Sequence, residues 1–140
     1  MALTYVKYYS GIAALLEADI DVSTDTFKIA LSNTAPDLTD VGLADASEIS
    51  AGNGYSAGGE TVTISSTGQT TGTYTVSVGS NVTFTATTGA IATFRYVILY
   101  SDTSTGDLLL GYWDYGSGVD ITAGNSFQCN LSGTDILTAS

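Results

Sequence analysis

Apolar and polar residues alternate along most of the chain beyond residue 26, and this period of two predicts β-strands. Phe27, Ile29 and Leu31 occupy every second position of residues 26–32, so they lie on one side of an extended chain. The pattern recurs, with mainly threonines and serines at the opposite positions, in residues 60–65, 73–78 and 81–86. Strands with one apolar and one polar face are typical of antiparallel sheets that expose one side to water.

Two further segments, residues 92–101 and 108–116, are apolar on both faces. Such strands lie at the centre of a sheet or carry another layer on their second face. In the first segment we expect one face to carry Phe94, Tyr96, Ile98 and Tyr100. We expect the other face to carry Arg95, Val97 and Leu99. The polar residues between the two segments predict a hairpin turn. Two shorter strands are expected near residues 119–122 and 126–132, followed by a short tail at residues 135–138.

The first part of the chain has a different pattern. Residues 10–20 predict a short helix with Ser10 as its N-cap. Its apolar face is expected to carry Ile12, Leu15 and Leu16. Residues 1–9 are rich in tyrosine and are expected to form an extended N-terminal arm. One helical turn is expected towards the end of residues 33–49.

Together these elements predict an all-β fold. We expect an antiparallel β-sandwich or flattened barrel of about eight to nine strands with one short N-terminal helix. A chain of 140 residues with no internal repeat and no linker suits a single β domain over residues 1–140. Its hydrophobic share of 44% is sufficient for a sizeable core.

The charge balance restricts the class of partner. Fourteen acidic residues stand against Lys7, Lys28 and Arg95, and the net charge is −11. Such a chain repels phosphate groups, so we expect no binding to nucleic acid or to anionic membranes. No apolar run is long enough to cross a bilayer, and residues 11–16 are too short for a secretory signal. We therefore expect no membrane insertion and no secretion through a signal peptide.

Residue types exclude several kinds of catalytic site. The chain has no histidine, which excludes Ser-His-Asp and Cys-His catalysis and most catalytic zinc sites. The single cysteine, Cys129, cannot form an internal disulfide. Its alternating position beside Phe127 and Leu131 indicates a small core residue rather than a nucleophile.

Carboxylate chemistry stays open. A glycosidase-like pair would come from Asp102, Asp107, Asp114 and Asp120. Asp114 lies between Trp113 and Tyr115, which resembles a sugar-binding arrangement. The aspartates of residues 19–25 and 102–107 offer oxygen ligands, but neither group has the spacing of a helix–loop–helix calcium site. We interpret both groups as solvated turns and expect no metal site and no cofactor.

The stretch GNGYSAGG, residues 52–59, suggests a phosphate-binding loop at first sight. A dinucleotide loop needs the spacing Gly-x-Gly-x-x-Gly and a following helix whose N-terminus meets the phosphates. Here the third glycine comes one residue late, a predicted strand follows, and the neighbouring charges of Glu48 and Glu60 are negative. We interpret the stretch as a backbone device that permits positive φ or a close chain approach, with Tyr55 as its anchor.

Four motifs, in this order, resemble those of a widespread family of small tailed-bacteriophage structural proteins. They are DTFKIAL, GNGYSAGG, RYVILY and LLGYWDYG, at residues 25–31, 52–59, 95–100 and 109–116. Each motif is short, but their number and order make the set fairly specific, and the match runs over nearly the whole chain. The resemblance implies a virion component without enzymatic activity, and it offers no catalytic residue to carry over.

A free-standing domain of this size, with no fibre repeat after its last expected strand, is most similar to a capsid decoration or cement protein. The resemblance then implies a place on the capsid exterior, after synthesis in the bacterial host cytoplasm. The expected partners are the major capsid protein and further copies of the chain in a homo-oligomer.

Two alternatives remain: a tail, neck or fibre-associated module that binds host glycans, and a small carbohydrate-active enzyme that uses Asp114. For the preferred function, the interface is expected among Tyr5, Tyr8, Tyr9, Arg95, Trp113 and Tyr115. More than half of these aromatic residues are nevertheless expected in the core, because aromatics on two-faced strands usually pack inside.

Overall fold

The computed structural model describes residues 3–140, and its fold is all-β and sandwich-like, with one short α-helix, as the sequence predicts. The helix α1 spans Tyr9–Leu16, and a 3-10 turn, η1, spans Leu43–Asp45. The strands within the described residues are β1 (Tyr5–Lys7), β2 (Phe27–Ser32), β3 (Glu60–Val62), β4 (Ile64–Thr70), β5 (Thr73–Val78), β6 (Val82–Thr85), β7 (Ile91–Ser101), β8 (Leu109–Ile121), β9 (Ser126–Cys129) and β10 (Asp135–Ala139).

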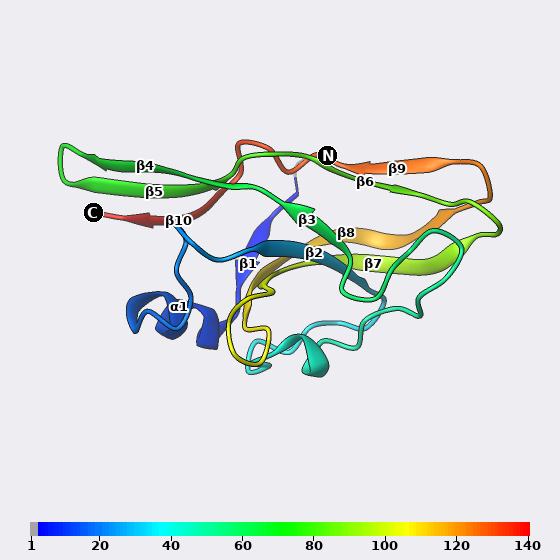
Figure 1. Ribbon diagram of the computed structural model, residues 1–140, viewed down its shortest axis with the longest axis horizontal. Helices are drawn as coiled ribbons and strands as arrows, with labels where there is room; N and C mark the ends of the chain where they lie inside the picture. The colour runs from blue at the N-terminus through cyan, green and yellow to red at the C-terminus, as the bar shows by residue number, and fades with distance from the viewer. Residues whose placement is uncertain (1–2) are drawn as a thin grey trace.

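Two layers of antiparallel strands enclose the main core (Figure 1). One layer is a five-stranded sheet with the order β1-β8-β7-β2-β3. The other layer consists of a three-stranded sheet, β10-β5-β4, and a two-stranded sheet, β6-β9. The β4–β5 hairpin extends from the body of the molecule, and α1 lies near the same end (Figure 1).

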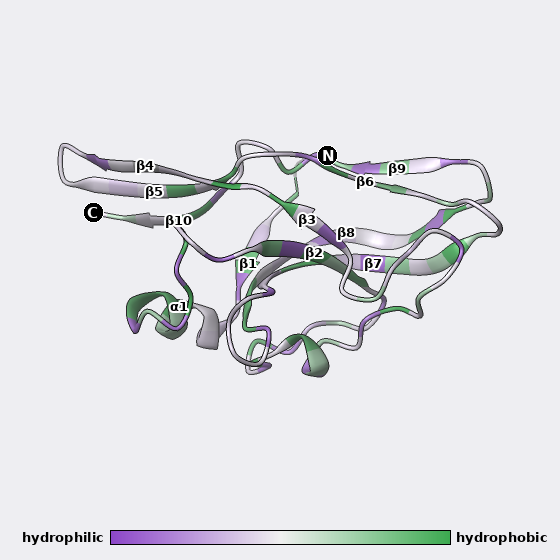
Figure 2. Cartoon of the chain, viewed as in Figure 1, coloured by the Kyte–Doolittle hydropathy of each residue, from purple (hydrophilic) through white to green (hydrophobic). Residues whose placement is uncertain are grey.

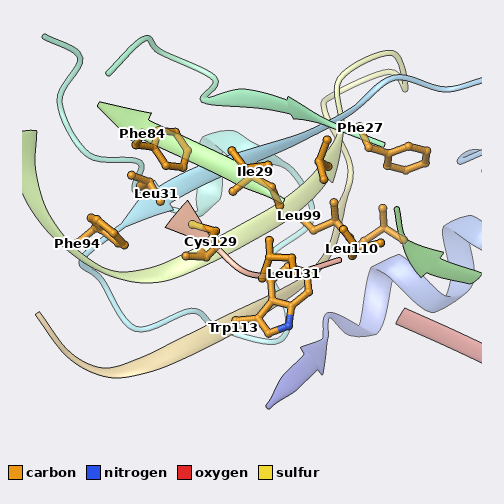
Figure 3. Close-up of a cluster of buried hydrophobic side chains, with 14 of the residues drawn as sticks. Phe27, Ile29, Leu31, Phe84, Phe94, Leu99, Leu110, Trp113, Cys129 and Leu131 are labelled. Atoms are coloured by element: carbon orange, nitrogen blue, oxygen red, sulfur yellow. The ribbon is translucent and has the colours of Figure 1, made fainter. Parts of the chain in front are cut away.

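The main core is made by the alternating residues of both layers. Figure 3 shows side chains from β2, β6, β7, β8 and β9 that meet between the layers. Phe27, Ile29 and Leu31 all lie in this core, as their alternation predicts. Cys129 is fully buried there as well.

The second face of the five-stranded sheet carries a smaller core, which we call the outer cluster. Its presence confirms that the central strands are apolar on both faces. This cluster consists of Tyr8, Ala30, Ala46, Ile98, Tyr100 and Leu109. Leu43 of η1 packs on its outer side, so the segment that contains η1 covers this face of the sheet.

The predicted faces of β7 are wrong at Phe94. Phe94 pairs with Val119 whereas Tyr96 pairs with Asp114, so two residues along β7 correspond to five along β8. Residues 115–118 of β8 therefore form a bulge, and a bulge shifts which side chains face the core. Phe94 joins the main core with Val97 and Leu99, whereas Tyr96 packs on Tyr112 at the other face.

Three local predictions at the N-terminus and at strand ends also need correction. The extended arm predicted at residues 1–9 ends before Tyr9, which begins α1, and its residues 5–7 form the edge strand β1, which pairs with β8; Met1 and Ala2 lie outside the described residues. Ser10 does not cap α1: its hydroxyl donates to the carbonyl oxygen of Asp40 at 3.0 Å, and the N-cap residue is Tyr8. The separate strand expected at residues 119–122 is the end of β8.

Candidate functional site

The glycine-rich loop, residues 48–59, runs between the two layers with a left-handed backbone. The residues with positive φ are Gly52, Asn53, Gly54, Gly58 and Gly59. A Cβ atom at Gly59 would overlap the carbonyl oxygen of Ile29 in β2, and one at Gly54 would overlap that of Thr85 in β6. Only glycine fits at these two positions, because the loop backbone lies directly on a strand from each layer.

Tyr55 anchors this loop inside the protein. Its side chain is 2% exposed, and its hydroxyl accepts from the backbone N–H of Leu31 at 3.0 Å. The same hydroxyl donates to Glu48 Oε1 at 2.6 Å. Burial, and next the bond to Glu48, raise the pKa of Tyr55 well above its usual value, so the hydroxyl keeps the proton that it donates.

Glu48 completes the fastening of the loop. Its Oε1 atom also accepts from the backbone N–H of Gly58 at 2.6 Å, and the hydroxyl of Tyr100 donates to the carbonyl oxygen of Gly58 at 2.6 Å. In a phosphate-binding loop, backbone N–H groups donate to the ligand. Here the N–H of Gly58 donates to a carboxylate of the chain itself. The sequence pointed to Tyr55 as the anchor but gave no sign that Glu48 would be its partner.

Arg95 and Asp114 bring two of the sequence motifs together. Arg95 Nε donates to Asp114 Oδ1 at 2.7 Å, and its Nη2 donates to Oδ2 at 3.0 Å. Asp114 Oδ1 also accepts from the N–H of Gly116 at 2.7 Å, inside the β8 bulge. Arg95 lies 5.3 Å from the ring centroid of Tyr96, beside the outer cluster, and not with the buried Val97 and Leu99 as predicted. The pair holds the bulge in shape.

The geometry around Asp114 and Cys129 bears on catalysis. The Arg95 side chain, through its hydrogen bond, lowers the pKa of Asp114, whereas a general acid needs a raised one. Burial raises the pKa of the Cys129 thiol to about 12, which keeps it protonated and unreactive at neutral pH. Asp102 forms an ion pair with Lys28 at 3.2 Å. These side chains contribute to folded contacts of the chain.

The predicted interface residues are not gathered on one surface. Tyr8 and Trp113 are fully buried, in the outer cluster and the main core respectively. Tyr5 packs on Trp113 with ring centroids 4.9 Å apart. Tyr115 packs edge-on against Phe127 at 5.3 Å, and against Phe94. Of the aromatic candidates, only Tyr9 is largely exposed, at 63%.

Tyr9 belongs to a helix whose apolar face is turned outwards. The buried residues of α1 are small, Gly11 and Ala14, and a Cβ atom at Gly11 would lie 2.6 Å from the carbonyl oxygen of Leu109. The helix can therefore approach β8 closely, while Ile12 is 40% and Leu16 81% exposed. Of the three residues predicted for the apolar face of the helix, only Leu15 is half-buried and packs on the main core. Figure 2 shows much of α1 in the colour of hydrophobic residues.

We define the exposed helix face as Tyr9, Ile12 and Leu16. Sequence analysis found Tyr9 but missed the other two, because apolar residues at helical spacing usually mark the packed side. The signal that would have found them is the small pair Gly11 and Ala14, which permits closer packing than a leucine does.

A separate hollow, of about 530 Å³, lies beside Trp113 and Tyr115. The other residues that line it are Leu3, Phe127, Gln128, Asn130 and Thr134. Aromatic rings next to amide and hydroxyl groups are suited to sugars in general. The hollow is thus lined by two residues of the predicted sugar-binding arrangement, although Trp113 itself is fully buried.

Two features are absent from residues 3–140, the part of the chain that the structure describes. No helix in this range is long and apolar enough to span a membrane. No three carboxylate or thiol groups in the same range are placed to hold a metal ion together.

Comparison of the chain with protein-family models, with curated proteins and with solved structures gave no match.

Proposed function

We propose that this chain is a non-catalytic structural protein of a tailed-bacteriophage virion, a decoration or cement protein that binds the outside of the capsid. The proposal starts from the four ordered sequence motifs. Polar residues of these motifs make internal contacts: Tyr55 holds the glycine loop through Glu48, a residue outside the motifs, and Arg95 and Asp114 hold the β8 bulge. Motif residues used in this way favour a protein whose function is its shape and its outer surface.

The exposed helix face is the observation that carries the proposal. A helix that buries glycine and alanine and exposes Tyr9, Ile12 and Leu16 gains little stability from these three large side chains, and only Leu15 among its larger residues packs on the main core. Exposed apolar surface of this kind is typical of a site that another protein covers. In a decoration protein this face would contact the major capsid protein or a neighbouring copy.

The experiment is a binding assay on capsids that lack the protein. Purified wild-type chain is added, and the bound fraction is measured by sedimentation and located by cryo-electron microscopy. We expect density on the outer capsid surface. We also expect at least about tenfold weaker binding for the double variant Tyr9→Ser, Ile12→Ser, whereas the control Tyr9→Phe, which keeps the apolar ring, binds as wild type. A protein that is absent from virions, or present only in their tails, contradicts the proposal.

A second candidate, glycan binding by a tail or neck module, is favoured by the hollow beside Trp113 and Tyr115. Because Trp113 is fully buried, Tyr115 and the exposed amide of Gln128 would make the contact. A glycan array should then give a signal that Gln128→Ala abolishes and the exposed control Thr83→Ala retains. An array without signal, together with density on the capsid, removes this candidate.

A further inference from the structure

An apolar groove lies between the C-terminal end of α1 and the three-stranded sheet. We call it the α1 groove, and its volume is about 340 Å³. Its lining includes Leu15, Leu16, Ile20, Tyr74, Val76 and Leu137. These residues come from the helix and the segment that follows it, from β5 and from β10, so the groove is a seam between elements far apart in the sequence.

The groove has a buried floor and an open lip. Ile20 and Val76 are only 2% and 1% exposed, whereas Leu16 at the lip is 81% exposed. A cavity of about 150 Å³ can take a benzene ring, so the α1 groove has room for one or two large apolar side chains. Its lip continues into the exposed helix face through Leu16.

The polar side of the groove is acidic. Glu17, Asp19 and Asp21 follow the helix directly and are all exposed, and Asp21 lines the groove itself. Hydrogen bonds from Ser23 lower the pKa of Asp21, so its carboxylate stays charged at neutral pH. No lysine or arginine is among the lining residues that the structure describes.

This charge distribution selects among occupants. A second copy of the chain would bring a net charge of −11, and two of its three cations, Lys28 and Arg95, are held in ion pairs with Asp102 and Asp114. Nucleic acids and anionic lipids would meet the same repulsion. A peptide segment that carries both apolar and cationic side chains satisfies the apolar floor and the acidic rim together.

We propose that the α1 groove binds an extended segment of a partner protein in which one or two large apolar residues are flanked by lysine or arginine. The inference deepens the proposed function and rests on it for the identity of the partner, which would be a basic, apolar segment of the capsid. Charge complementarity at such a rim speeds association and fixes the register of the segment.

The test uses the full chain and short synthetic peptides, so it does not depend on the virion. The probe is acetyl-Lys-Leu-Leu-Lys-amide, and the charge-reversed probe is acetyl-Glu-Leu-Leu-Glu-amide. Binding is followed by ¹⁵N NMR shifts and calorimetry. We expect the lysine peptide to shift residues around Leu16, Ile20 and Leu137. We expect the glutamate peptide to bind at least about tenfold more weakly, with a difference that salt reduces.

Matched variants separate the two features of the groove. Leu16→Gln should weaken the lysine peptide about fivefold or more, whereas Val41→Gln, at an exposed apolar residue outside the lining, should not. Asp21→Asn should weaken it about two- to threefold. Asp37→Asn is the control, because Asp37 also accepts from a residue two positions on, Thr39, but lies outside the lining.

Three results would overturn the inference. The first is equal binding of the two peptides, and the second is NMR shifts that map away from the groove. The third is a wild-type oligomer, seen by ultracentrifugation, that Leu16→Gln dissociates, because a second copy would then be the occupant. If the chain binds the lysine peptide but is absent from capsids, the inference about the α1 groove stands and the proposed function is refuted.

Discussion

The glycine-rich loop and the helix α1 both dock on the five-stranded sheet through a glycine, yet they treat their large side chains in opposite ways. Gly59 of the loop lies on Ile29 of β2, and Gly11 of the helix lies on Leu109 of β8. The loop turns Tyr55 inwards and satisfies its hydroxyl twice. The helix leaves Leu16 at its surface.

The polarity of a segment therefore does not decide which of its side chains are buried. The loop looks polar and flexible in sequence, but its backbone conformation brings a tyrosine into the core. The helix looks like a core element, but close backbone approach at Gly11 occupies the space that a leucine would need. The large side chain of the loop therefore contributes to the core, whereas those of the exposed helix face do not.

The largest expected effect tests the docking of the loop. In Gly59→Ala the new Cβ atom would overlap Ile29, and alanine would be strained at φ +73°. We expect the free energy of unfolding in urea to fall by about 3 kcal/mol or more. Gly72→Ala is the control, since φ is +85° there but no atom lies within 4 Å of its Cβ position. That control should cost only about 1 kcal/mol, and equal losses would show that the close approach contributes nothing.

A second prediction compares one tyrosine from each region. Tyr55→Phe leaves the N–H of Leu31 without its acceptor and Glu48 without one donor, so the free energy of unfolding should fall by about 2 kcal/mol. Tyr9→Phe removes a hydroxyl from an exposed ring and should change it by less than about 0.5 kcal/mol. Similar losses for the two variants would show that the buried hydroxyl of Tyr55 contributes no more to stability than the exposed hydroxyl of Tyr9.

Much of the sandwich could be predicted from alternation, because period two fixes which residues of β2, β5 and β6 face inwards. The face of Phe94 could not, because the bulge depends on how β7 and β8 pair and not on either strand alone. For the same reason Arg95 was assigned to the wrong face. The exposure of Ile12 and Leu16 depends on how closely the helix approaches the sheet. In the sequence, only the small residues Gly11 and Ala14 indicate that close approach.

The candidate site was less predictable than the fold. The sequence predicts that more than half of the aromatic interface candidates lie in the core, but it does not tell which ones: Tyr8 and Trp113 are fully buried, whereas Tyr9 is exposed. The α1 groove joins residues from α1, β5 and β10, and no local pattern connects segments so far apart in the chain.

A third, smaller effect concerns the ion pair of Arg95 and Asp114. Like the contacts of the loop, it joins residues of the sequence motifs, but like the helix face it is exposed. The pKa of Asp114 is lower in the folded chain than in the unfolded chain, chiefly through the Arg95 hydrogen bond. Its contribution to stability is therefore present above the unfolded value, about pH 4, and is lost as the pH falls through the folded value.

Asp114→Asn should accordingly lower the urea midpoint at neutral pH, and the difference from wild type should shrink below about pH 4. Because both side chains are more than a third exposed, at 39% and 38%, we expect a smaller loss than for Tyr55→Phe. Glu60→Gln, at an exposed residue, controls for the general effect of removing one negative charge. A difference that stays constant with pH would mean that the carboxylate charge does not support the bulge.

The smallest expected effect is the most telling for the helix. Glutamine has nearly the helix propensity of leucine, so Leu16→Gln should change the free energy of unfolding by less than about 0.5 kcal/mol. Leu31→Ala in the main core, where the side chain is fully buried, should cost about 3 kcal/mol by the same urea measurement. A loss for Leu16→Gln that approached the core value would place Leu16 among the residues that hold the fold. A negligible loss would show that its apolar surface does not stabilise the fold, which is what the proposed partner contact requires.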